Sequence, residues 1–244
     1  MTDKKDVASE GIAGVVAPSP GAAIETFLHQ ARQVSPAPER SPLARLVFAL
    51  DATMSRQPTW DLACRVQGDM FETAADIGGL SVQLVYFRGF NECRASKWVA
   101  EPRALTDLMA RIGCRGGNTQ IGRVLRHVRN EAHRGPLKAF VYVGDAMEEP
   151  VDDLCAVAGE LGLLGVKGFL FHEGGDPVAA GAFQEIARLT GGAYARFDTG
   201  APRSLAGLLR AAAAYASGGA SALERLAGRD GDARKLLSAM STGR

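Results

Sequence analysis

Short apolar runs alternate along most of this sequence with longer segments of helical periodicity. An uninterrupted apolar run, long enough for a strand buried on both faces, occupies 46–50, and mostly apolar segments of strand length occupy 82–87, 137–143, 166–171 and 193–197. Between them, apolar residues recur every three or four positions, which is the spacing of a helix with one buried face. This alternation predicts a doubly wound, Rossmann-like α/β sheet with helices on both faces.

Proline, glycine and aspartate define the ends of the expected helices. Residues 92–99 follow the turn around Gly89-Phe90-Asn91, so we expect a hairpin and an antiparallel edge strand in a six-stranded, mostly parallel sheet. The expected helices run from Pro58 to about Ile77, over 102–112, from after Gln120 to about His133, after Pro150, from Asp176-Pro177 to Gly191, and over 202–216.

Three regions follow from this pattern. Residues 1–42 are expected to be a disordered tail that contains a short helix at 21–34 and a Pro-rich linker. The helix is interpreted either as a strap packed on the domain or as a docking helix. Residues 43–216 form the domain, and 217–244 form a C-terminal helical extension whose helices, within Ala220–Met240, are expected outside the core.

Composition places the chain among ordinary globular proteins. It has 244 residues, of which 46% are hydrophobic and 23% charged, and its net charge of +1 argues against nucleic acid as a general partner. The four cysteines form no Cys-x-x-Cys pair and are expected to be reduced thiols. No apolar run approaches the roughly 20 residues of a membrane span, and the amino-terminal stretch lacks a signal-peptide pattern, so a cytoplasmic location is expected.

Polar chemistry begins where the first strand ends. The sequence there is Asp51-Ala52-Thr53-Met54-Ser55, with an acid and two hydroxyl residues at alternate positions. Ligands of open parallel sheets bind beyond the carboxyl ends of the strands. Carboxylate and hydroxyl oxygens suit Mg²⁺, Mn²⁺ or Ca²⁺, so the segment predicts a site for a hard cation.

The spacing Asp-x-Thr-x-Ser resembles the metal-ion-dependent adhesion site (MIDAS) of von Willebrand factor type A (VWA) domains, where the middle residue is usually Ser. Thr119, in Gly116-Gly117-Asn118-Thr119, and Asp145, after the strand at 137–143, match the other two positions of that pattern. The resemblance covers residues 43–216 and is closest to bacterial intracellular members of the family. It implies a Mg²⁺ site, or one for Mn²⁺ or Ca²⁺, formed by Asp51, Thr53, Ser55, Thr119 and Asp145.

The resemblance also implies a function. Neutral hydroxyl ligands leave the cation electrophilic, and a carboxylate from a partner protein can displace one of its waters. We therefore expect a metal-dependent protein-binding adaptor and no enzyme activity, with an AAA+ ATPase or a stress-linked assembly as partner by family analogy. A second interpretation is that the hydroxyls cap the next helices and the aspartates hold loops.

The alternative function is a metal-dependent phosphohydrolase of the haloacid dehalogenase type. That chemistry needs a second acid two residues after Asp51, where this chain has Thr53. The sequence also lacks a Gly-x-x-x-x-Gly-Lys loop, a Gly-x-Gly-x-x-Gly loop after the first strand and a Gly-x-Ser-x-Gly elbow. Turnover of a generic phosphate ester with Mg²⁺ discriminates between the two functions.

Other polar residues near the expected site have two interpretations each. Glu148 and Glu149 either add a cation ligand or favour the positive amino end of a helix. His172 either faces the same rim or is an ordinary loop histidine. The arginines after Thr119 are either a solvated helix face or a docking surface for an acidic partner or RNA, and they are Arg123, Arg126, Arg129 and Arg134.

Overall fold

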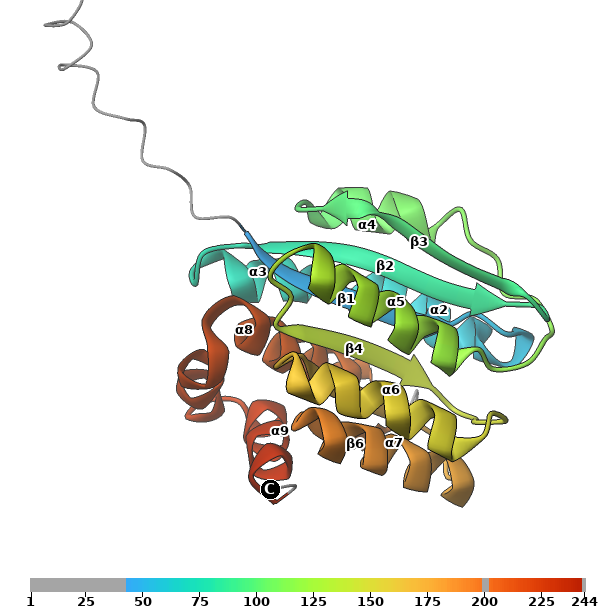
Figure 1. Cartoon of the computed structure of the whole chain (residues 1–244). Coiled ribbons are helices and arrows are strands. Elements are labelled where there is room, and N and C mark those ends of the chain that lie inside the picture. Colours follow the sequence, from blue (N-terminus) through green and yellow to red (C-terminus); the bar gives the residue numbers. More distant parts are fainter. Residues whose placement is uncertain (1–42, 199–201, 243–244) are drawn as a thin grey trace, which may run out of the picture. The chain divides into compact units, whose positions relative to one another are not determined.

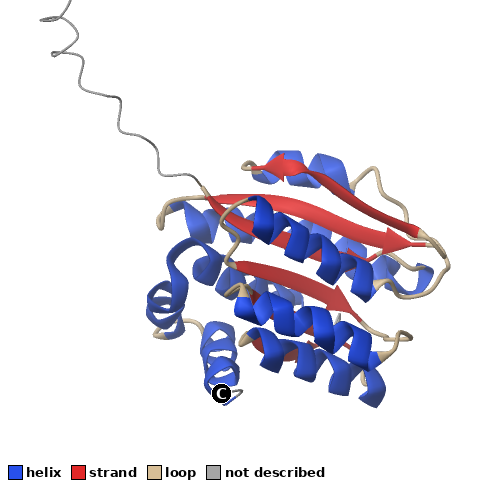
Figure 2. Ribbon diagram, in the orientation of Figure 1, coloured by secondary structure: helices blue, strands red, loops and turns tan. Residues whose placement is uncertain are grey.

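The computed structural model describes residues 43–198 and 202–242. The tail, short helix and linker expected in residues 1–42 lie outside the described residues. Six strands form one sheet, in the order β3-β2-β1-β4-β5-β6. Figure 2 shows strands of this sheet in red among the helices. The strands are β1 (Ala44–Asp51), β2 (Leu80–Arg88), β3 (Glu92–Val99), β4 (Ala139–Gly144), β5 (Lys167–Glu173) and β6 (Ala193–Phe197).

The expected sheet is confirmed. Strand β3 pairs antiparallel with β2 at one edge, and all the other pairs are parallel. Helices cover both faces of the sheet (Figure 1). One face carries α5 (Ile121–Arg134), α6 (Val151–Leu163) and α7 (Pro177–Thr190), and the other carries α2 (Gln57–Val66), α3 (Gly68–Ala75), α4 (Pro102–Met109), α8 (Pro202–Ala227) and α9 (Gly231–Thr242).

Strand β1 is buried on both sides because its residues alternate between two hydrophobic cores. Leu46, Phe48 and Leu50 belong to the core under α2, α3, α8 and α9, whereas Val47 and Ala49 belong to the core under α5, α6 and α7. A strand with apolar side chains on both faces is stable only between two helix layers. Burial on both faces therefore explains why residues 46–50 are all apolar.

Strand β1 is the point at which the chain changes the side of the sheet to which it adds strands. From β1 it proceeds to β2 and β3 on one side, and it then crosses to β4 on the other side. In an open α/β sheet, this switch point leaves a crevice at the carboxyl ends of the two central strands. Asp51 is the last residue of β1 and Asp145 directly follows β4, so the two aspartates flank the crevice.

The helix expected from Pro58 to Ile77 is two helices. The α2 and α3 segments meet at Gln67, which keeps a right-handed helical backbone (φ −63°, ψ −25°). The Gln67 side chain is buried and its Nε2 donates to the Pro102 carbonyl and, at 2.6 Å, to Thr106 Oγ1 of α4. This contact joins the α2–α3 junction to a helix distant in sequence.

The C-terminal helices are present, but the expectation that they lie outside the core is wrong. Helix α8 bends at Gly219 (φ 68°, ψ −160°) and ends at Ala227, and α9 begins at Gly231. Leu223, Ala227, Ala233 and Leu236 are buried in the same core as the face of β1 that bears Phe48. Helix α9 packs against α8 and β6. The segment therefore completes one helix layer of the domain.

The structure shows no helix of sufficient length and apolarity for a membrane span in the part of the chain that it describes.

Candidate functional site

Four of the five predicted site residues lie together at the carboxyl edge of the sheet. The Thr53 N–H donates to Asp51 Oδ1 at 2.7 Å, which folds the loop after β1 back over the strand end. The hydroxyls of Thr53 and Ser55 are 3.4 Å apart, and Ser55 Oγ lies 3.5 Å from Asp145 Oδ2. These oxygens come from two loops that flank the switch point.

Thr119 reaches the site through the loop that follows β4. Its hydroxyl accepts from the Glu148 N–H at 3.0 Å, and its own N–H donates to Glu148 Oε2 at 3.0 Å. Among the described residues, Thr119 bonds to Glu148 and to none of the other four predicted ligands. The structure thus places Thr119 against the loop of Asp145 without direct contact to the cluster.

Glu148 and Glu149 hold the amino end of a helix, although it is not the helix that follows them in sequence. Glu149 Oε2 accepts from the Ile121 N–H at 2.5 Å and Oε1 accepts from the Gly122 N–H at 2.9 Å. Both N–H groups belong to the first turn of α5, which has no partner for them within the helix. The two glutamates therefore fasten the β4–α6 loop to the segment that carries Thr119.

The segment before α5 also approaches the β2–β3 turn very closely. A Cβ atom on Gly117 would lie 2.0 Å from the Gly89 carbonyl oxygen, so only glycine fits there. Gln120 Nε2 donates to that same carbonyl at 3.2 Å. Gly117 therefore has a packing role here, whereas a Cβ atom on Gly116 would have no neighbour within 4 Å.

Asp51 is a charged group in a poorly hydrated place. It is 3% exposed, and burial raises its pKa from 3.8 to about 6 against the opposing hydrogen bond from Thr53; Asp145 adds to the rise and Arg56 opposes it. Asp51 Oδ2 and Asp145 Oδ1 are buried and have no hydrogen-bond partner among the described residues. Buried polar atoms usually have a hydrogen-bond partner, so these two oxygens are suited to contact a bound cation or an ordered water molecule.

The donor set also fits a hard cation in its chemistry, since it combines carboxylates with hydroxyls. Within residues 43–198 and 202–242, no group of three or more His, Cys, Asp or Glu side chains is placed to hold a metal ion. Any metal site here consequently depends on the hydroxyls of Thr53, Ser55 and Thr119.

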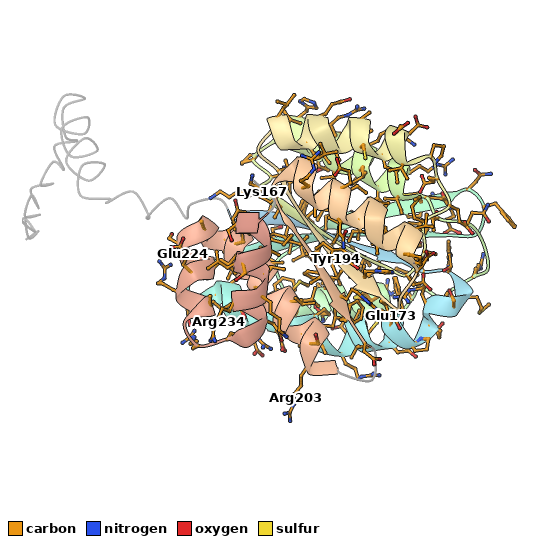
Figure 3. The ribbon with its side chains drawn as sticks, turned by 90° about the horizontal axis from the view of Figure 1, so that it is seen from below. Lys167, Glu173, Tyr194, Arg203, Glu224 and Arg234 are labelled. Atoms are coloured by element: carbon orange, nitrogen blue, oxygen red, sulfur yellow. The ribbon has the colours of Figure 1, made fainter. Side chains whose placement is uncertain are left out.

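A residue for which the sequence predicted no role, Arg56, lies inside the cluster. Its side chain is 3% exposed, and its Nη1 pairs with Glu173 Oε2 and lies 3.5 Å from Asp145 Oδ2. Glu173, labelled in Figure 3 at the end of β5, also accepts from the Thr59 hydroxyl. Arg56 Nε and Nη2 are buried and have no partner among the described residues. The site therefore contains a built-in positive charge.

His172 is buried in β5 and is neither a loop histidine nor a rim residue. Its Nε2 lies 3.3 Å from the Asp145 carbonyl oxygen and its Nδ1 lies 2.9 Å from Oη of Tyr194, which is labelled in Figure 3. A carbonyl only accepts, so Nε2 carries the proton and Nδ1 of the neutral ring accepts from the tyrosine. Burial lowers the pKa of His172. The residue fixes the backbone at Asp145.

The arginines of α5 are mostly engaged within the domain. Arg123 donates to Asn91 and Gln120, Arg129 pairs with Glu160, and Arg134 pairs with Glu131. These contacts support the interpretation of a solvated helix face over that of a basic docking surface.

The sequence carried little signal for Arg56 and Glu173. Arg56 follows Ser55 in a polar segment and gives no periodic cue, and Glu173 lies two residues past the apolar run at 166–171. Burial of a charged residue depends on which distant carboxylates surround it, and that depends on strand order. The positions of Asp51 and Asp145 follow from strand ends, which the sequence does indicate.

Comparison with known proteins finds proteins of similar structure but none of matching sequence. No protein-family model matches the sequence, and no curated protein matches it. The VWA domain of SpRpn10 superposes with a TM-score of 0.54 at 11% identity, over 67% of this chain and 95% of that domain. An aerotolerance-related membrane protein from Bacteroides fragilis superposes with a TM-score of 0.51 at 17% identity, over 68% of this chain and 98% of its own.

A third neighbour is proximal thread matrix protein 1 from the mussel byssus, with a TM-score of 0.55 at 12% identity, over 71% of this chain and 47% of that protein. Identities this low establish the fold and nothing finer. The chain therefore has the fold of VWA domains, as the resemblance implied.

Proposed function

We propose that this chain is a protein-binding module that contacts its partner through a divalent cation, Mg²⁺ in the first place and Mn²⁺ or Ca²⁺ as substitutes. Asp51, Thr53, Ser55, Thr119 and Asp145 hold the ion, and an Asp or Glu side chain of the partner completes its coordination. The observation that carries the proposal is the pair of buried, unpartnered carboxylate oxygens on Asp51 and Asp145, at the switch point of the sheet.

The spacing of the oxygens supports this proposal. Separations of 3.4 Å between the two hydroxyls and 3.5 Å between Ser55 and the Asp145 carboxylate are long for O–H···O hydrogen bonds, whose usual length is about 2.7–2.8 Å. Neighbouring oxygens around one cation are about 3 Å apart for Mg²⁺ and about 3.5 Å apart for Ca²⁺, given metal–oxygen distances of about 2.1 and 2.4 Å. The two measured separations match the value for Ca²⁺, and Mg²⁺ would need the three oxygens to move about 0.5 Å closer together.

The charge of the cluster supports it as well. Arg56 pairs with Asp145 and Glu173 and acts electrostatically on Asp51, so three carboxyl groups share one guanidinium. Buried carboxylates repel one another unless a cation is present. A bound divalent cation would neutralise this excess of carboxylate charge.

The surroundings of the site suit a protein partner. Met54, Phe90, Val151 and Val178 are exposed, and each follows or begins an element at the same carboxyl edge of the sheet. Exposed apolar side chains around a polar centre are typical of interaction surfaces. One structural neighbour, the SpRpn10 domain, is a VWA domain. An AAA+ ATPase or a stress-linked assembly in the cytoplasm remains the proposed class of partner.

Metal binding is tested by melting curves in Mg²⁺, in Mn²⁺ and in chelator. A cation that binds only the folded chain stabilises it by roughly 2.7 kcal/mol at a hundredfold excess over the dissociation constant. Asp145→Ala and Thr119→Val should lose most of this gain, whereas Thr119→Ser retains the hydroxyl and should keep it. A wild type whose melting temperature ignores both cations at millimolar concentration contradicts the proposal.

Partner binding is tested by affinity capture in Mg²⁺ and again in chelator. Proteins that wild type retains only in Mg²⁺, and that Asp145→Ala fails to retain, are held through the ion. Phe90→Ser should reduce their recovery without a change in metal binding. No observation favours the phosphohydrolase, and steady turnover of a generic phosphate ester with Mg²⁺ would contradict the adaptor function.

A further inference from the structure

The guanidinium of Arg56 occupies the place where the charge of a cation is needed. It lies one residue beyond Ser55, and its side chain is almost entirely removed from solvent. Nη1 is shared between Asp145 Oδ2 and Glu173 Oε2, so one nitrogen serves two carboxylates. Asp145 is also a proposed ligand of the divalent ion.

The contacts of Arg56 are those of a replaceable partner. Arginine is held most firmly when two nitrogens meet the two oxygens of one carboxylate. Here Nε and Nη2 lack partners among the described residues, while Asp51 Oδ2 and Asp145 Oδ1 lack donors in the same cluster. Donors and acceptors are both left unpaired, so the guanidinium neutralises the cluster without matching its geometry.

Glu173 provides a position to which Arg56 can withdraw. Glu173 Oε2 accepts from the Thr59 hydroxyl as well as from Arg56, and this carboxylate stands on β5, on the far side of β4 from β1. A divalent ion bound at Asp51 and Asp145 would repel a guanidinium at contact distance from Asp145. Movement onto Glu173 relieves that repulsion and keeps Arg56 paired.

We propose that Arg56 is an internal cation that competes with the divalent ion for Asp145 and thereby lowers the affinity of the site for metal. In the absence of metal, Arg56 bridges Asp145 and Glu173 and neutralises the cluster; with metal bound, it pairs with Glu173 alone. This inference rests on the proposed function, because it concerns the same site. It assigns Arg56 the role of an affinity-determining residue.

The first test measures the affinity for Mn²⁺ from the electron paramagnetic resonance signal of the free ion. Arg56→Gln should bind Mn²⁺ at least about tenfold more tightly than wild type, because a positive charge has been removed at contact distance from a ligand. Arg56→Lys retains the charge and should stay closer to wild type. Arg65→Gln removes an equal charge from the exposed face of α2 and should leave the affinity unchanged.

Three outcomes are distinct. Tighter binding by Arg56→Gln alone supports the competition. Equal binding by wild type and Arg56→Gln overturns it and leaves the metal-dependent function standing. No Mn²⁺ binding by either protein, at concentrations at which circular dichroism shows both folded, overturns this inference and the proposed function together.

A second measurement does not use Arg56→Gln and applies even if that variant fails to fold. The guanidinium Nε–H of Arg56 gives a ¹⁵N–¹H signal that is identified by its absence from Arg56→Lys. Saturation with diamagnetic Mg²⁺ should shift this signal, because the guanidinium leaves Asp145. An unchanged signal at saturating Mg²⁺ would show that Arg56 is only a structural ion pair.

Discussion

Asp51 is an acidic residue whose burial lowers the stability of the fold at neutral pH. It terminates the central strand β1, and its burial favours the protonated form. Its pKa is higher in the folded chain than the ordinary value of 3.8, so its contribution to stability declines as the pH rises from 3.8 to about 6. At neutral pH the ionised group is fully unfavourable unless a cation is bound.

Asp51→Asn should therefore stabilise the metal-free protein. At pH 7 in chelator we expect a gain of up to about 3 kcal/mol, which corresponds to the raised pKa. The same change should abolish the stabilisation by Mg²⁺. Denaturant unfolding in chelator and in Mg²⁺ measures both effects, with Asp61→Asn on the exposed face of α2 as the control. A loss of stability in the Asp51→Asn variant in chelator would show that the carboxylate is needed for the loop itself.

Glu131 illustrates the opposite case, a buried acid with enough partners. It accepts from Arg45 Nη2 at 2.5 Å, Arg134 Nη1 at 2.6 Å and Trp98 Nε1 at 3.2 Å, and the Arg45 guanidinium also lies over the Trp98 ring. Burial by itself would raise the pKa of Glu131, but the bonds from Arg134 and Trp98 and the charge of Arg45 lower it below 4.5. These contacts join α5 to β1 and β3.

Glu131→Gln should lower stability at pH 7 by roughly 2 kcal/mol, as expected for hydrogen bonds to charged groups. Because the pKa is lowered on folding, this contribution is present above pH 4.5 and disappears as the pH falls through the lower folded-state value. Urea unfolding across the acid range should show wild type converging on the variant. Glu160→Gln breaks the more exposed pair with Arg129 and should cost less than about 1 kcal/mol.

At the scale of elements, the loop after β4 and the amino end of α5 behave as one unit. Glu149 satisfies two N–H groups of the first turn of α5, and Glu148 satisfies the N–H of Thr119. Carboxylates at a helix amino end are stabilising because they meet unpaired N–H groups and the positive end of the helix dipole. The position of Thr119 therefore depends on two residues that follow Asp145.

Glu149→Ala should cost about 1–2 kcal/mol, the usual effect of the loss of a helix cap. It should also weaken Mg²⁺ binding, because the segment with Thr119 loses its attachment. Asp153→Ala, in the first turn of α6 and exposed, is the matched control and should change both quantities little. Thermal melts with and without Mg²⁺ give both numbers. Unaltered Mg²⁺ stabilisation in Glu149→Ala would separate Thr119 from the metal site.

At the scale of the whole molecule, the C-terminal helices belong to the described core. Helix α8 carries Ala211–Ala214, all fully buried, and such small side chains let it lie close to the sheet. Beyond the bend at Gly219, Leu223 and Leu236 are fully buried too. The sheet face under α8 and α9 would be exposed to water without them, at a cost of about 25 cal/mol for each Å² of apolar surface.

Leu236→Ala should therefore reduce stability by about 2–5 kcal/mol, the range for a fully buried leucine. Leu163→Ala is the matched control, because Leu163 on α6 is 92% exposed and its loss should cost less than about 0.5 kcal/mol. Removal of residues 219–244 should give protein without a cooperative unfolding transition. A truncated chain that unfolds cooperatively at the wild-type midpoint would show that α9 is an appendage.

The sequence by itself determined the features that depend on local periodicity. Apolar runs indicated the strands, because a strand between two helix layers needs apolar residues on both faces. Asp176 and Gly191 marked both ends of α7, since capping is a local interaction: Asp176 accepts from the Val178 N–H and Gly191 adopts a left-handed backbone. Strand ends placed Asp51 and Asp145 on one edge, because parallel strands end together.

Tertiary structure alone decided the partners of polar groups and the membership of the core. Three contacts join residues at least 27 positions apart in the sequence. Gln67 bonds to Pro102, Arg56 pairs with Asp145, and Glu149 caps α5 at Gly122. The local pattern around each residue is silent on such contacts, because strand order and helix placement create them. For the same physical reason, the apolar faces of the C-terminal helices could be recognised in the sequence, but the surface that they cover could not. The tertiary structure shows that this surface is one face of the sheet.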